Sequence, residues 1–224
     1  MDIVGNITRL FYQGGWVIML SITATLVVSL VIIIERSLRY WLTFDLPNSS
    51  EFAKEVERLV YNNSIEHAIR YCKKKRPALV PYVLAEGLKH ANDSTEEIAN
   101  AMDHATYAAV PNVTTRLPLL ATTANVATLL GLLGTIFGLM KSFAAAARAT
   151  GSEKQALLAE GIAEALTATS YGLGTALLCL FAYGVLSMKQ TSIVDDINKH
   201  TSRLVGVLYS RRVRLKSSSA TPRA

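Results

Sequence analysis

The apolar residues of this chain gather in three long runs, and this arrangement constrains its fold more than any other feature. Half of the 224 residues are hydrophobic. The runs cover residues 16–34, 117–140 and 161–188. At about 1.5 Å per helical residue, each run is long enough to cross a hydrocarbon layer of about 30 Å. We therefore predict an all-α integral membrane protein with three transmembrane helices.

The basic residues indicate how these helices are oriented. Of the 23 Lys and Arg residues, 19 lie between the first two runs or after the third. Because cytoplasmic segments carry the excess of Lys and Arg, we expect a cytoplasmic domain over residues 35–116 and a basic cytoplasmic tail over 189–224. The N-terminal segment 1–15 and the loop 141–160 would face outward, which for a bacterial inner membrane is the periplasm. The net charge of +6 suits anionic lipid headgroups and does not require a nucleic-acid partner.

Helical periodicity continues outside the membrane. It predicts three cytoplasmic helices, which begin near Glu51, Ser64 and Ser94. Ser94 and Glu97 have the spacing of a capping box. Pro111 and Pro118 are expected to interrupt the third of these helices before the second span. An apolar stripe past the third run predicts that the third long helix continues beyond the membrane; the stripe comprises Ile193, Ile197, Leu204 and Leu208. We expect the second and third long helices to extend into a packed helical domain.

The sequence gives few signs of catalytic or metal-binding chemistry. The four histidines are scattered, and we expect solvated side chains at His67, His90, His104 and His200. Cys72 falls in the cytoplasmic domain and Cys179 in a span, so a disulfide is not expected. We expect no enzyme activity, no cofactor and no metal.

The second apolar run carries a stripe of polar side chains. At 100° per residue, Thr128, Thr135 and Ser142 lie within about 20° of one line, and Asn125 flanks it. Such a stripe suits an ion path, although a single hydroxyl in a membrane helix often bonds only its own backbone. Close helix packing is expected on the small-residue surface of the same run, at Gly131, Gly134 and Gly138.

The third run contains Glu164, and an ionisable group near membrane depth indicates function. Thr169 lies about 140° round the helix from it, so one face cannot present both side chains. If Thr169 faces a central pathway, Glu164 must point toward a neighbouring helix or subunit. An alternative is that Glu164 lies close enough to the outer boundary to reach water.

Two stretches of these runs resemble a known family. Residues 131–140 read Gly-Leu-Leu-Gly-Thr-Ile-Phe-Gly-Leu-Met, and residues 161–166 read Gly-Ile-Ala-Glu-Ala-Leu, followed by Ala168-Thr169. These motifs resemble the second and third spans of the MotA/TolQ/ExbB proton-channel family. With its three predicted spans, the chain resembles the three-span ExbB and TolQ branch of this family.

The resemblance implies a pentamer of this subunit around a dimer of single-span partners of the ExbD or TolR type, in the bacterial inner membrane. It implies a stator-like subunit that converts a proton flux into mechanical work on periplasmic or outer-membrane partners. Thr135 and Thr169 would line the pore around a partner aspartate, and Glu164 would be functionally important.

Two other interpretations stay open. The chain could be a membrane scaffold that recruits cytoplasmic proteins and conducts nothing. It could also be a sodium-driven version of the motor, for which the additional hydroxyls Thr128, Thr167 and Ser170 are the candidates.

Overall fold

The computed structural model describes residues 15–46, 48–75 and 77–220. In these residues every regular element is a helix, and three helices are long and apolar enough to cross a membrane. Most of the expected periplasmic segment 1–15 and the last four residues of the tail lie outside the described residues. The chain divides into two compact units.

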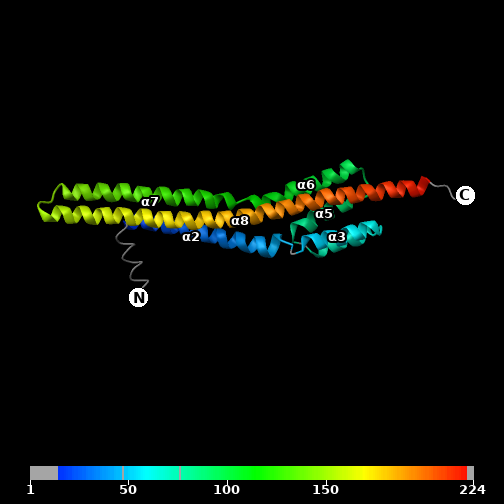
Figure 1. Ribbon diagram of the computed structural model, residues 1–224, viewed down its shortest axis with the longest axis horizontal. Helices are drawn as coiled ribbons and strands as arrows, with labels where there is room; N and C mark the ends of the chain where they lie inside the picture. The colour runs from blue at the N-terminus through cyan, green and yellow to red at the C-terminus, as the bar shows by residue number, and fades with distance from the viewer. Residues whose placement is uncertain (1–14, 47, 76, 221–224) are drawn as a thin grey trace. The chain divides into compact units, whose positions relative to one another are not determined.

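The first unit holds the membrane helices. It comprises α2 (Trp16–Leu38) up to Arg36, α7 (Leu117–Ala146) and the part of α8 (Ser152–Ala220) up to Leu186. Figure 1 shows α7 and α8 running side by side. Only residues 147–151 separate α7 from α8. The segment 141–160, which we expected as a loop, is therefore largely helical, because both helices continue past their apolar runs.

Small residues bring α7 and α8 into close contact. Gly131, Gly134 and Gly138 are buried on α7. A Cβ placed on Gly134 would lie 2.6 Å from the Cβ of Ala168, and one on Gly138 would lie 3.0 Å from the Cβ of Ala165. The glycines thus lie in the helix contact, where a side chain of any size would separate the two backbones.

A short break precedes the second span. The helix α6 (Thr95–Thr114) contains Pro111 without ending there, and α7 begins at Leu117 with a proline in its first turn. Between them, Arg116 has a φ of 68°. The interruption therefore falls between the two prolines named above.

The second unit is a helical bundle. It comprises the π-helix η1 (Arg39–Phe44), α3 (Ser49–Tyr61), α4 (Ile65–Lys74), α5 (Leu79–Lys89), α6 and residues 187–220 of α8. Each helix from α3 to α6 packs against the next. The expected apolar stripe on α8 is buried, and the capping box is present, with Glu97 N 3.2 Å from Ser94 Oγ and Ser94 N 2.8 Å from Glu97 Oε2. The prediction of a packed helical domain is confirmed.

Two details of this bundle differ from our expectations. The sequence analysis did not predict α5, whose Pro81 lies in the first turn, where a missing N–H costs no helical hydrogen bond. The prediction that His200 is solvated is wrong, since its side chain is 3% exposed. His200 lies one turn from both Ile197 and Leu204 and so belongs to the buried stripe of α8.

Candidate ion pathway

Glu164 lies where all three membrane helices meet. Its Oε2 is 3.2 Å from Nζ of Lys141 on α7. Its Oε1 lies against the start of α2, because a Cβ placed on Gly15 would be 3.3 Å from that oxygen. The N-terminus of a helix carries partial positive charge, so a carboxylate is favoured there. The Glu164 side chain is 18% exposed, and it contacts a neighbouring helix instead of extending freely to water.

A small cavity adjoins this carboxylate. It measures about 110 Å³ and is bounded by α7 and the first turns of α8. Its walls carry Lys141 together with Glu160 and Glu164, which are one helical turn apart. These charged side chains make this end of the unit polar, and together they can hydrogen-bond to water.

Thr169 and Glu164 point to different neighbours. The Thr169 hydroxyl donates to the backbone carbonyl of Gly131 on α7, with the oxygens 2.9 Å apart. Tyr171 instead shares a 3.3 Å hydrogen bond with Thr23 of α2. The Glu164 carboxylate therefore lies between the start of α2 and Lys141 of α7, whereas the Thr169 hydroxyl contacts the α7 backbone.

The polar stripe on α7 divides into two parts. Thr135 is half-buried and donates to the Leu132 carbonyl at 2.6 Å, while Thr128 is exposed and donates to the Ala124 carbonyl at 3.1 Å. A hydroxyl that donates to its own helix keeps its oxygen as an acceptor. Asn125 is exposed beside them.

Ser142 belongs to the second part of the stripe. It is buried and donates to the Leu157 carbonyl of α8 at 3.1 Å. This places its hydroxyl in the contact between α7 and α8, next to the cavity at Glu164. Ser142 therefore takes part in the packing of α7 against α8, and its pore-facing role stays a prediction.

The structure adds two ion-pairing residues that the sequence analysis did not select. One is Lys141. The other is Arg116, whose Nη1 lies 2.8 Å from Glu35 Oε1 and links the start of α7 to the end of α2. Each is a charged residue directly beside an apolar run. The signal that could have identified Lys141 is the short connection between the second and third runs, which brings Lys141 close to Glu164.

The hydroxyls proposed for sodium do not form one group. Thr167 and Ser170 line an open hollow of about 350 Å³ with Met19, Leu166 and Tyr171. Thr128 lies on α7 and is not among these lining residues. The Thr167 hydroxyl donates to the Ala163 carbonyl at 2.8 Å.

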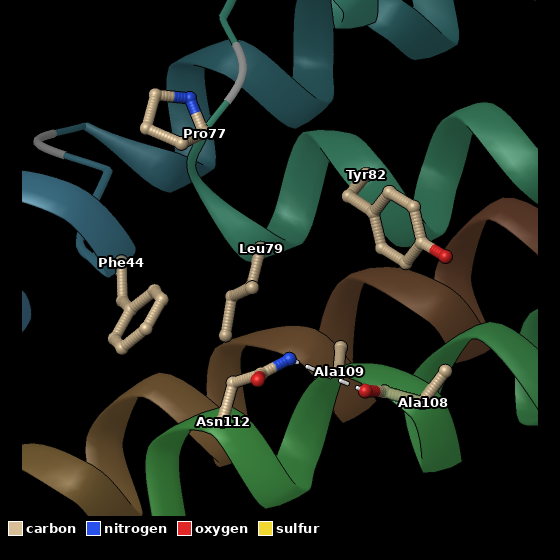
Figure 2. A pocket seen from close by; sticks show the side chains of 7 residues that line it. All are labelled: Phe44, Pro77, Leu79, Tyr82, Ala108, Ala109 and Asn112. Carbon is tan, nitrogen blue, oxygen red and sulfur yellow. Dashed lines mark hydrogen bonds between the residues drawn. The ribbon is translucent and has the colours of Figure 1, made fainter.

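The second unit contains a cavity that is more apolar than the one at Glu164. This cavity measures about 280 Å³. Figure 2 shows Phe44, Leu79 and Tyr82 around it. The side-chain amide of Asn112 also lines this cavity, and it donates to the Ala108 carbonyl of the same helix at 3.3 Å. Among the described residues, no group of His, Cys, Asp and Glu could hold a metal ion. The membrane unit therefore offers the more informative candidate site.

Residues 75–199 match the model of the MotA/TolQ/ExbB proton channel family. The chain belongs to this family. The matched MotA/TolQ/ExbB region contains α7, the apolar part of α8 and all the residues proposed for the pathway. The expectation of a MotA/TolQ/ExbB member of the ExbB and TolQ type is confirmed.

Several MotA/TolQ/ExbB relatives are similar to the chain. The Tol-Pal system protein TolQ of Haemophilus influenzae is 35% identical over 54% of this chain and 55% of its own length. The biopolymer transport protein ExbB of Pseudomonas putida is 31% identical over 56% of this chain and 36% of its own length. A putative ExbB-like biopolymer transport protein of Synechocystis is 27% identical over 82% of this chain and 88% of its own length. The chain spans about half the length of the TolQ relative that it matches.

Proposed function

We propose that this chain is the pore-forming, stator-like subunit of a membrane motor driven by the proton motive force. Five copies would surround a dimer of a single-span ExbD/TolR-like partner in the bacterial inner membrane. The N-terminus would be periplasmic and the C-terminus cytoplasmic. Relative rotation of the pentamer and the dimer would do mechanical work on periplasmic or outer-membrane partners, without bond-making chemistry.

The observation that carries this proposal is the set of polar groups on apolar helices inside the family match. Thr135 and Thr169 supply hydroxyls, and Glu164 joins the three helices at one end of the unit. A hydroxyl can donate or accept, so it can solvate a water molecule or a carboxylate without adding fixed charge. The proposal assigns Thr135 and Thr169 to the pore lining and Glu164 to a supporting position.

The energy source follows from elementary electrostatics. An acid in a low-dielectric lumen favours its neutral form, so a partner aspartate there would cycle between protonated and charged states. One elementary charge that crosses the membrane gains about 2.3 kcal/mol per 100 mV. Each proton can therefore drive only a modest rearrangement, which suits stepwise rotation better than a single large change.

The test is proton flux into vesicles that contain this chain and its single-span partner. We expect flux that needs the partner and falls in Thr135→Val and in Thr169→Val. Thr122→Val is the matched control, because Thr122 lies on the same helix, about 140° round from Thr135. Wild-type flux in both pore variants would remove these threonines from the mechanism.

Two other outcomes lead to different functions. Absence of flux with and without the partner, together with capture of cytoplasmic proteins by the second unit, would favour the scaffold. A flux that stops when potassium replaces sodium would favour the sodium-driven motor. Thr167 and Ser170 are then the first positions to change, because both line the hollow beside α2.

A further inference from the structure

The ion pair between Lys141 and Glu164 is asymmetric. The two side chains come from α7 and α8, and their charged atoms are 3.2 Å apart. The Lys141 side chain is 74% exposed, whereas that of Glu164 is 18% exposed. The largely exposed side chain of Lys141 therefore reaches from the surface to a largely enclosed carboxylate.

Glu164 is held from two sides. Lys141 contacts Oε2, and the start of α2 at Gly15 lies beside Oε1. The two oxygens of the Glu164 carboxylate meet different helices. The Lys141 ammonium, by holding one of these oxygens, therefore sets the direction of the carboxylate plane. A carboxylate with one oxygen released could rotate about its terminal torsion, which has broad preferences.

The cavity contains a second carboxylate near Lys141. Glu160 lines the same space as Glu164, one turn earlier on α8. Of the described residues that line this cavity, Lys141 is the one cation. In the structure its Nζ lies on Glu164. The position of the Lys141 ammonium therefore distinguishes the Glu164 carboxylate from that of Glu160.

We propose that Lys141 is a positioning residue for Glu164 and holds its carboxylate at the junction of the three membrane helices during ion transfer. Glu164 then acts as a fixed joint between helices and not as a mobile ion carrier. Lys141 has no direct contact with the transferred ion. This inference rests on the proposed function, because it assigns Lys141 a role in the same ion transfer.

The test is a double-mutant cycle on partner-dependent proton flux. It compares the wild type with Lys141→Met, Glu164→Gln and the double variant. We expect each single change to lower the flux about tenfold, which corresponds to about 1.4 kcal/mol. The double variant should have the same flux as Glu164→Gln alone, because Lys141 acts only through Glu164. Lys141→Arg should recover most of the flux.

The matched control is Lys154→Met. Lys154 is an exposed lysine in the first turn of α8, near the same end of the unit, and does not line the cavity. We expect wild-type flux from this variant. Independent, multiplying losses in the double variant would overturn the proposal, and so would wild-type flux from Lys141→Met.

A second measurement separates this proposal from the function on which it rests. The unfolding midpoints of the same four proteins in lipid nanodiscs report whether the pair joins α7 to α8, and they need no transport. If the effects of the two substitutions on the midpoint are not additive but the wild type shows no flux, then the ion pair exists. The proposed function, and with it the positioning role, would then fail. Uncoupled midpoints with a normal wild-type flux would overturn the positioning role alone.

Discussion

The Thr169 hydroxyl donates to the backbone carbonyl of Gly131, and the two oxygens lie 2.9 Å apart. A Cβ placed on Gly131 would lie 3.3 Å from the Cα of Thr169, so the backbones of α7 and α8 almost touch at this point. Thr169 therefore has two tasks in the proposed function. It ties two helices together, and its oxygen keeps the capacity to accept a hydrogen bond from the pathway.

Replacement of Thr169 should separate these tasks. Thr169→Ser keeps the donor and should keep most of the proton flux. Thr169→Val keeps the shape, removes the hydroxyl and should lower the flux at least tenfold, while the loss of one interhelical hydrogen bond costs about 0.6 kcal/mol of unfolding free energy. Flux and unfolding midpoints in nanodiscs measure the two effects. Equal flux from the Ser and Val variants would contradict this assignment.

Gly172 on α8 should be sensitive to substitution, because the backbone of α7 lies directly against it. A Cβ at this position would lie 2.7 Å from the Ala127 carbonyl oxygen and 2.9 Å from the Cα of Gly131, which are backbone atoms that cannot turn aside. We expect Gly172→Ala to lower the unfolding free energy by about 1–3 kcal/mol. Gly174→Ala, two residues away, is the control, because a Cβ there meets nothing within 4 Å. Similar midpoints for the two variants would mean that the helices are not in close contact.

His200 should make the stability of the second unit depend on pH. Burial lowers the pKa of His200 below its ordinary value of 6.5; among nearby charges, Asp196 and Glu57 raise it, whereas Lys199 and Arg203 lower it. The unfolded chain therefore binds a proton at a higher pH than the folded chain. The unfolding free energy should fall as the pH drops below about 6.5, by at most about 1.4 kcal/mol per pH unit.

Chemical denaturation between pH 7.5 and pH 5.5 would measure this dependence. His200→Leu should flatten the profile in that window, because its apolar side chain suits the buried stripe and does not titrate. His67→Gln, at an exposed histidine on α4, should leave the His200 contribution in place. A profile for His200→Leu as steep as that of the wild type would assign the pH dependence to other groups.

Cys72 should be inert in the folded protein. Burial raises the pKa of its thiol to about 12, so the reactive thiolate is scarce at pH 8. We expect labelling by iodoacetamide only after denaturation, measured by mass spectrometry of the cleaved peptides. Glu66→Cys supplies an exposed thiol on the same helix as a positive control. Equal labelling at both cysteines before denaturation would show that α4 opens readily.

Much of the fold could be predicted from the sequence because hydrophobic patterning is strong in this chain. Apolar runs located the three long helices, and the Ser94 capping box located the start of α6. The sequence analysis did not predict the helix α5, although its Pro81 lies in the first turn, where a proline is compatible with a helix. His200 was judged by its residue type alone, without the apolar neighbours one turn away that bury it.

The candidate site was harder to predict than the fold. Helical periodicity separated the directions of Glu164 and Thr169, since angles within one helix follow from sequence spacing. It could not identify Lys141, because pairing between helices depends on how far each helix continues past its apolar run. It also grouped Ser142 with Thr135, although local contact with α8 occupies the Ser142 hydroxyl.

The close contact between α7 and α8 also limits where ions can travel. Cβ positions on Gly131, Gly134, Gly138 and Gly172 would fall 2.6–3.3 Å from the nearest atoms of the opposite helix, which leaves no room for a file of water molecules along this line. A route for protons must therefore lie outside the seam between these two helices. In the proposed assembly, conduction is then a property that arises only when copies and partner come together, and an isolated subunit would be electrically silent.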